Sequence, residues 1–109
     1  MRVLRPGGLI GVRDADWGGV LVHPSDAVVD GALAQFSAAI RNSGGDPEIG
    51  RRLGGILKEA GFGAIRMTAS YEVYDPAVAA LYLSRLTGGH AIGSGLFLAQ
   101  PWCEAVGTK

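Results

Sequence analysis

A helical pattern in the middle of the chain runs directly into a strand pattern, and this succession constrains the fold more than any other feature. Asp46 and Pro47 are typical of a helix start, and Gly61 is typical of a left-handed helix end. The apolar face between them consists of Ile49, Leu53, Ile56, Leu57 and Ala60. From Ile65 to Val73 apolar and polar residues alternate, which predicts a strand with one wetter face. A helix that leads straight into a strand favours an α/β fold.

The residues before this unit predict a turn followed by a strand. In Arg5–Gly8, Pro6 presets φ and Gly7 supplies a positive φ, as a β-turn requires. The apolar run at residues 9–12 predicts a strand that continues towards Asp14. Because this run is apolar on both faces, it favours an interior strand of a parallel sheet that is covered by helices.

Two further helices and a last strand complete the pattern. Ser25 is the expected N-cap of a first helix, whose apolar stripe consists of Val29, Leu33, Phe36 and Ile40. Asp75–Pro76 begins a shorter helix that Gly88–Gly89 stops. Strand-forming residues predominate from Leu96 to Val106, with Pro101 predicting a bulge or a bend. The expected order is strand, helix, helix, strand, helix, strand.

Composition narrows the function classes. A chain of 109 residues suffices for one domain with a modest core. Ten basic and ten acidic residues balance to zero net charge, which offers no electrostatic footprint for nucleic acid or for a membrane surface. Cys103 is the single cysteine, so a disulfide framework is excluded and a reducing, cytoplasmic location is expected. No stretch is apolar and long enough for a signal peptide or a membrane span.

Three stretches of the chain match one family in the same order. "RVLRPGGLIGVRDADW" resembles the entry to the fifth strand of class I S-adenosylmethionine-dependent methyltransferases, in particular the group similar to ubiquinone and menaquinone biosynthesis methyltransferases. "IGRRLGGILKEAGFGAIRM" is similar to the helix and sixth strand of that group, and "FLAQPWCEAVGTK" is similar to its closing antiparallel strand. The resemblance implies a Rossmann-like sheet in which the seventh strand lies between the fifth and the sixth.

The resemblance also places residues 1–109 in the C-terminal, substrate-side half of a methyltransferase domain. In relatives an internal methionine commonly precedes the first stretch, so Met1 is expected to be an internal residue taken as a start, or the edge of a truncated gene. The glycine-rich loop for S-adenosylmethionine would then lie upstream of Met1. Two GxG matches remain, at Gly61–Gly63 and Gly93–Gly95, but neither follows a strand and opens a helix as a cofactor loop does. No cofactor-binding residue is therefore expected here, and this chain alone should not bind the cofactor.

Candidate substrate-binding residues follow the first strand. Ligands of open α/β sheets bind beyond the carboxyl ends of the strands, where Asp14, Asp16 and Trp17 are expected. The two carboxylates would contact the methyl acceptor, or one would accept its proton; alternatively they form a polar strand end with an Asx-turn at Asp16.

Other polar residues are weaker candidates. His23, in the next loop, would be a base or an acceptor contact, or a solvated loop residue. Arg51–Arg52 would steer an anionic acceptor or form a solvated helix face. Two distant histidines and one cysteine show no metal-ligand spacing, so no metal site is expected.

Three functional hypotheses follow from these patterns. In the first, the chain is the C-terminal part of a methyltransferase that acts on a small-molecule acceptor and needs its missing N-terminal half. In the second, the same residues form a non-catalytic α/β module that self-associates as a homodimer through a bare sheet edge. In the third, the cofactor-binding half is a separate chain and the enzyme is split.

Overall fold

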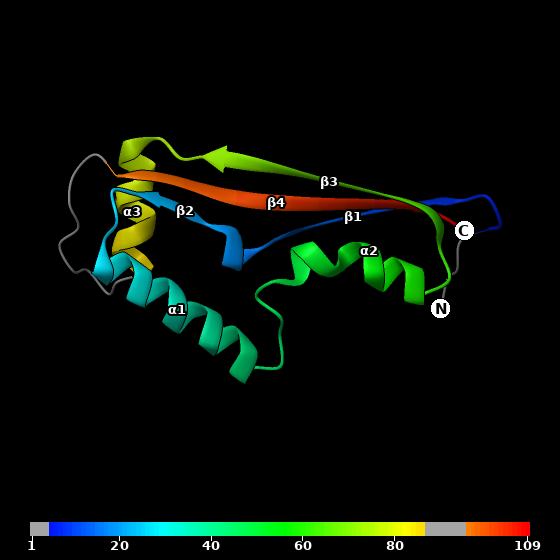
Figure 1. Cartoon of the computed structure of the whole chain (residues 1–109), viewed down its shortest axis with the longest axis horizontal. Helices are drawn as coiled ribbons and strands as arrows, with labels where there is room; N and C mark the ends of the chain where they lie inside the picture. The colour runs from blue at the N-terminus through cyan, green and yellow to red at the C-terminus, as the bar shows by residue number, and fades with distance from the viewer. Residues whose placement is uncertain (1–4, 87–95) are drawn as a thin grey trace.

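A long strand, β4 (Phe97–Thr108), is the centre of a four-stranded sheet in the computed structural model, which describes residues 5–86 and 96–109 (Figure 1). β1 (Leu9–Ala15) and β2 (Leu21–His23) pair with one edge of β4, end to end. β3 (Gly63–Val73) pairs with the other edge. The α/β class is therefore confirmed, and the last strand lies between the first strand and the strand that follows the second helix.

The prediction of a parallel sheet with an interior first strand is wrong. β4 is antiparallel to each of its partners, so β1 and β3 run in the same direction but do not touch within the sheet. β1 is also covered on one face only: Ile10 and Val12 pack towards a helix, whereas Leu9 is 68% exposed. An apolar run does not distinguish these cases, because a buried parallel strand and a half-covered antiparallel strand can share it.

The second helix, α2 (Ile49–Glu59), covers one end of the sheet. Its Leu53 and Leu57 pack with Cys103 and Ala105 of β4 in a buried cluster. The helix begins later than expected, because a turn comes first in which the Asp46 carboxylate accepts a hydrogen bond from the Glu48 backbone N–H at 2.9 Å. The predicted left-handed glycine at the helix end is confirmed, since Gly61 has φ +94°.

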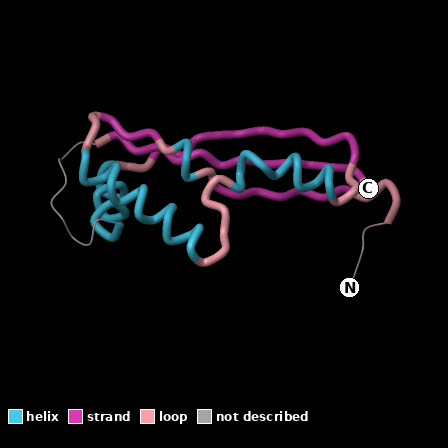
Figure 2. The backbone as a smooth tube through the Cα atoms, turned by 60° about the horizontal axis from the view of Figure 1, so that its bottom comes forward, coloured by secondary structure: helices cyan, strands magenta, loops and turns pink. Residues whose placement is uncertain are grey.

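The other end of the sheet is covered by α1 (Ala27–Asn42) and α3 (Pro76–Leu86), which lie apart from α2 in both ribbon views (Figure 1, Figure 2). A second buried cluster there consists of Val29, Ala79, Leu96 and Leu98. Leu98 and Cys103 are five positions apart on β4, so their side chains project from opposite faces and the two clusters are separate.

The cap of α1 is Asp26 and not the expected Ser25. The Asp26 carboxylate accepts hydrogen bonds from the backbone N–H groups of Val28 and Val29 at 2.9 and 3.1 Å. Aspartate is as good a cap as serine, and its position one residue later suits the first helical turn. The expected stop of α3 at Gly88–Gly89 lies outside the described residues.

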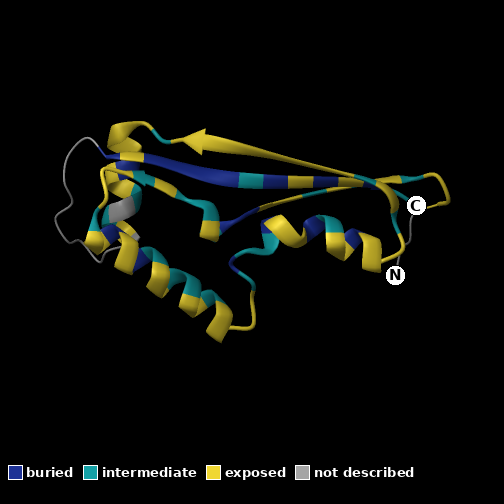
Figure 3. Cartoon of the chain, in the orientation of Figure 1, coloured by how far each residue is buried: buried dark blue, intermediate teal, exposed yellow. Residues whose placement is uncertain are grey.

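Burial follows the central strand. Figure 3 shows β4 largely buried, whereas β3 is exposed along most of its length. The expected bulge at Pro101 does not occur, because Pro101 stands in register with Tyr71. The Pro101 carbonyl accepts a hydrogen bond from the Asp16 N–H at 3.3 Å, so this side of Pro101 faces the break between β1 and β2. Proline has no N–H to donate, and at this break no strand residue needs that donor. That break holds a short helix, η1 (Trp17–Gly19).

Candidate functional site

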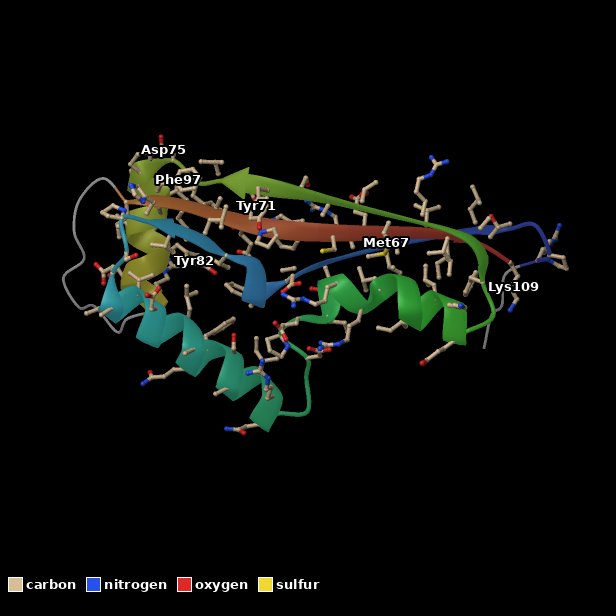
Figure 4. The ribbon with its side chains drawn as sticks, in the orientation of Figure 1. Met67, Tyr71, Asp75, Tyr82, Phe97 and Lys109 are labelled. Carbon is tan, nitrogen blue, oxygen red and sulfur yellow. The ribbon has the colours of Figure 1, made fainter. Side chains whose placement is uncertain are left out.

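A pocket of about 640 Å³ opens between α1 and α3. From α1 it is lined by Ala32, Gln35 and Phe36, and from α3 by Val78, Leu81, Tyr82 and Arg85. Figure 4 shows Tyr82 beside α3 and above α1, far from the labelled Met67 near α2. The volume lies within the range of sites that hold small molecules, and the lining is mainly apolar with a few polar groups, as is usual for such sites.

An aromatic cluster backs this pocket. The ring planes of Trp17 and Tyr82 are nearly parallel, at 3°, with centroids 6.2 Å apart. Phe36 meets Trp17 edge to face at 4.6 Å, and Tyr74 stacks on Tyr82 at 5.6 Å. Four rings from four segments of the chain therefore fix one another in place, because offset-stacked and edge-to-face pairs are the favoured aromatic geometries.

Buried polar atoms accompany these rings. Gln100 of β4 is only 3% exposed, and its side-chain oxygen accepts a hydrogen bond from the Tyr74 hydroxyl at 3.3 Å. The Gln100 amide nitrogen and the Tyr82 hydroxyl are also buried, and neither has a hydrogen-bond partner among the described residues. Such atoms are rare in folded proteins, since burying a polar group without a partner is costly. The cluster therefore holds two unused hydrogen-bonding groups.

The tyrosine hydroxyls of the cluster stay protonated at neutral pH. Burial raises the pKa of Tyr82, and the nearby Tyr74 raises it further. Burial also raises the pKa of Tyr74, with the Glu72 carboxylate adding to the effect. Both groups are therefore hydrogen-bond donors and not bases in the neutral range.

Of the residues predicted from the sequence to bind substrate, Trp17 alone belongs to this aromatic cluster. Asp14 is exposed, and its carboxylate accepts from the Ala15 backbone N–H at 2.8 Å. His23 is exposed at the end of β2, and alternation points it away from the face on which Val22 joins the α1–α3 core. Asp16 directly precedes Trp17 but is bound elsewhere, as described next.

Asp16 is buried in an ion pair with Arg51 of α2. Arg51 Nε lies 2.5 Å from Asp16 Oδ2, and Arg51 Nη2 lies 3.0 Å from Asp16 Oδ1. The Asp16 carboxylate also accepts from the Gly18 backbone N–H at 2.9 Å, so the expected Asx-turn is present. The hydrogen bonds that Arg51 donates to the Asp16 carboxylate, together with the negative charge of that carboxylate, raise the pKa of Arg51.

This pair corrects the interpretation of Arg51–Arg52 as a solvated helix face. Arg51 is half exposed but holds a buried carboxylate, whereas Arg52 pairs with the more exposed Asp46 at 2.6 Å. The pair explains Asp16 structurally, because its oxygens already have three hydrogen bonds. Asp16 therefore positions Trp17 next to it in the chain.

Sequence reasoning missed the polar part of the cluster. Tyr82 falls in an apolar helical stripe, which predicts packing and does not reveal a pocket. Gln100 stands among strand-forming residues, where it attracts no attention. One signal could have identified it: alternation places this polar residue on the same strand face as the apolar Leu98 and Trp102.

The GxG match that the structure describes does not have the placement of a cofactor loop. Gly61–Gly63 joins the end of α2 to the start of β3, whereas a loop for a nucleotide cofactor joins a strand to a helix. The match at Gly93–Gly95 lies outside the described residues. The described match therefore lacks the strand-to-helix placement of a cofactor loop.

Comparison with known proteins leaves the family open. No protein-family model and no curated protein matches the chain. Within residues 5–86 and 96–109, none of the helices has the length and apolar character needed to cross a bilayer. Function must therefore be inferred from the sheet and the pocket.

Proposed function

We propose that this chain is the substrate-side portion of a class I S-adenosylmethionine-dependent methyltransferase that acts on a small-molecule acceptor. The observation that carries the proposal is the strand order. β4 lies antiparallel between β1 and β3, which run in the same direction, and this is the order that the resemblance implies for the fifth, seventh and sixth strands of a Rossmann-like sheet. In an unrelated α/β fold, the same strand order and the three matching sequence stretches would have to occur together by chance.

The position of the pocket supports the proposal. Ligands of open α/β sheets bind beyond the carboxyl ends of the parallel strands. Trp17 comes two residues after the carboxyl end of β1, and Tyr74 directly follows the carboxyl end of β3. Both rings stack on Tyr82, which lines the pocket. The pocket is therefore at the edge of the sheet where an acceptor would have to bind.

The chemistry required of these residues is modest. Methyl transfer is an in-line displacement, for which the protein mainly aligns two molecules and excludes water. The apolar walls of the pocket would exclude water, and the Phe36 and Tyr82 side chains that line it would orient the acceptor. The described residues near the pocket contain no histidine or carboxylate that lines it, so we assign no catalytic base.

The cofactor would be held by other polypeptide. Gly61–Gly63 joins a helix to a strand and not a strand to a helix, so we propose that an N-terminal half, in the same chain or in a separate subunit, supplies the site for S-adenosylmethionine. The outer edge of β1 has no strand partner among the described residues and would accept a further strand. The lone, buried Cys103 suits a reducing compartment, and we place the protein in the cytoplasm.

The same bare edge favours a second candidate function, a non-catalytic module that forms a homodimer through β1. Reading the gene upstream of the Met1 codon separates the candidates. An in-frame extension that encodes a strand, a glycine-rich loop and a helix is expected for the methyltransferase. An in-frame stop favours a split enzyme if a neighbouring gene encodes that cofactor-binding half, and the module if none does.

A further inference from the structure

We propose that the pocket between α1 and α3 binds a flat aromatic acid, that is, a planar ring system that carries one carboxylate. That such an acid is the methyl acceptor rests on the proposed function. That the pocket binds it depends only on the described residues.

Shape and lining point to a flat ring system. The pocket volume of about 640 Å³ suits a small organic molecule and is too small for a folded partner. Phe36 and Tyr82 contribute aromatic walls, and Trp17 contacts both rings from behind. Because each wall is held by another ring, these walls are preorganised, and a planar ligand can stack on them without first ordering them.

Charge points to an acid. Arg85 is the single charged side chain among the described residues that line the pocket. It is exposed, and it forms no ion pair with any described residue, in contrast to Arg51 and Arg52 of α2, which hold carboxylates. A guanidinium pairs with a carboxylate through two parallel hydrogen bonds and also stacks on aromatic rings. A cationic ligand would be repelled by the same group.

Calorimetric titration of the 109-residue chain with four probes tests the inference. The probes are 2-naphthoate, its neutral isostere 2-naphthamide, the cation 2-naphthylmethylamine and the aliphatic acid decanoate. We expect 2-naphthoate to bind tightest, with a preference of about threefold to tenfold over the amide, which is the range for one partly exposed charge pair. Equal or tighter binding of the amide, the amine or decanoate would overturn the ligand class, and so would absence of binding by all four.

Matched variants locate the site. Arg85→Gln should remove the preference for the acid over the amide, whereas Arg66→Gln, on exposed β3, should leave it unchanged. Val78→Trp should fill the pocket and abolish binding of every probe, and Val73→Trp, also exposed but on β3, should not. Far-ultraviolet circular dichroism verifies that each variant is folded. A folded Val78→Trp variant that binds as tightly as the unmodified chain would place the site elsewhere.

The inference and the proposed function fail separately. Loss of the aromatic-acid preference leaves binding of S-adenosylmethionine by a longer polypeptide unaffected, and rejects only the acceptor class. Conversely, specific binding of 2-naphthoate without any methyltransferase activity in the longer polypeptide would retain the pocket and reject its role in methyl transfer.

Discussion

Asp16 and Arg51 join the end of β1 to α2 through two hydrogen bonds, with Arg51 Nε 2.5 Å from Asp16 Oδ2 and Arg51 Nη2 3.0 Å from Asp16 Oδ1. The side chain of Asp16 is only 7% exposed and that of Arg51 is half exposed. This contact fixes the chain just before Trp17, whose ring backs the pocket. The part of the fold under α2 is therefore coupled to the candidate site between α1 and α3.

Removing the buried carboxylate should destabilise the fold. Asp16→Ala deletes the acceptor of three hydrogen bonds, two from Arg51 and one from the Gly18 N–H. We expect the free energy of unfolding to fall by about 1–3 kcal/mol in urea denaturation. Arg52→Ala is the matched control on the same helix: its ion pair with Asp46 is exposed, so its effect should be clearly smaller. Equal losses in the two variants would contradict a structural role for Asp16.

Two glycines of α2 should respond in opposite directions to alanine. A Cβ at Gly50 would lie 3.0 Å from the backbone of Asp14 and Ala15, whereas one at Gly55 would meet nothing within 4 Å. Gly50→Ala should therefore push α2 off β1 and cost about 1–3 kcal/mol of stability. Gly55→Ala should stabilise by about 0.5–1 kcal/mol, because alanine is the better helix residue. Thermal unfolding of the two variants measures both changes in stability. If Gly50→Ala stabilised the protein, α2 would not approach β1 as closely as described.

Alkaline pH should destabilise the chain through Tyr82. Burial raises the folded-state pKa of Tyr82 above its unfolded value near 10, so the folded protein holds this proton more tightly. The stabilising contribution is fully present below pH 10 and is lost as the pH rises through the folded pKa. The raised pKa of Cys103 adds a similar loss above pH 9.

Tyr82→Phe should reduce the loss of stability between pH 9 and pH 11, as measured by urea midpoints at each pH. Tyr71→Phe is the matched control, because Tyr71 is 49% exposed and its hydroxyl donates to the Gly19 carbonyl at 2.9 Å. That variant should lose stability at high pH as the unmodified chain does. An unchanged pH dependence in Tyr82→Phe would show that the Tyr82 hydroxyl is not buried.

Local patterns in the sequence located most elements of the fold. The start of α3 at Asp75–Pro76, the apolar stripe of α2 and the positive φ of Gly61 depend on neighbours in the chain, so they are readable without a structure. β2 was not predicted, because three residues, Leu21–His23, are too few to show alternation. The antiparallel direction of β4 was expected from the family resemblance alone, and the apolar run at residues 9–12 wrongly indicated a parallel sheet, since strand direction is set by pairing partners and not by the strand's own residues.

The candidate site was less predictable than the fold. Asp16 and Arg51 are 35 positions apart, and a helix arginine looks solvated until its partner is known. The stripes of α1 and α3 look the same whether they fill a core or line a pocket, and the difference depends on how closely the two helices approach. Trp17 was predicted because strand ends mark ligand sites in open sheets, a rule that depends on fold class alone, and its role in binding a ligand stays a prediction.

Calorimetry with S-adenosylmethionine is the most direct test of the proposed function. The first sample is the 109-residue chain alone. The second is the longest polypeptide that the same reading frame encodes or, if a separate gene encodes the cofactor-binding half, a mixture of that half with the 109-residue chain. We expect no heat of binding for the 109-residue chain and micromolar binding for the longer protein or the mixture. Micromolar binding by the 109-residue chain would contradict the placement of the cofactor site outside it, and absence of binding in every case would contradict the methyltransferase proposal.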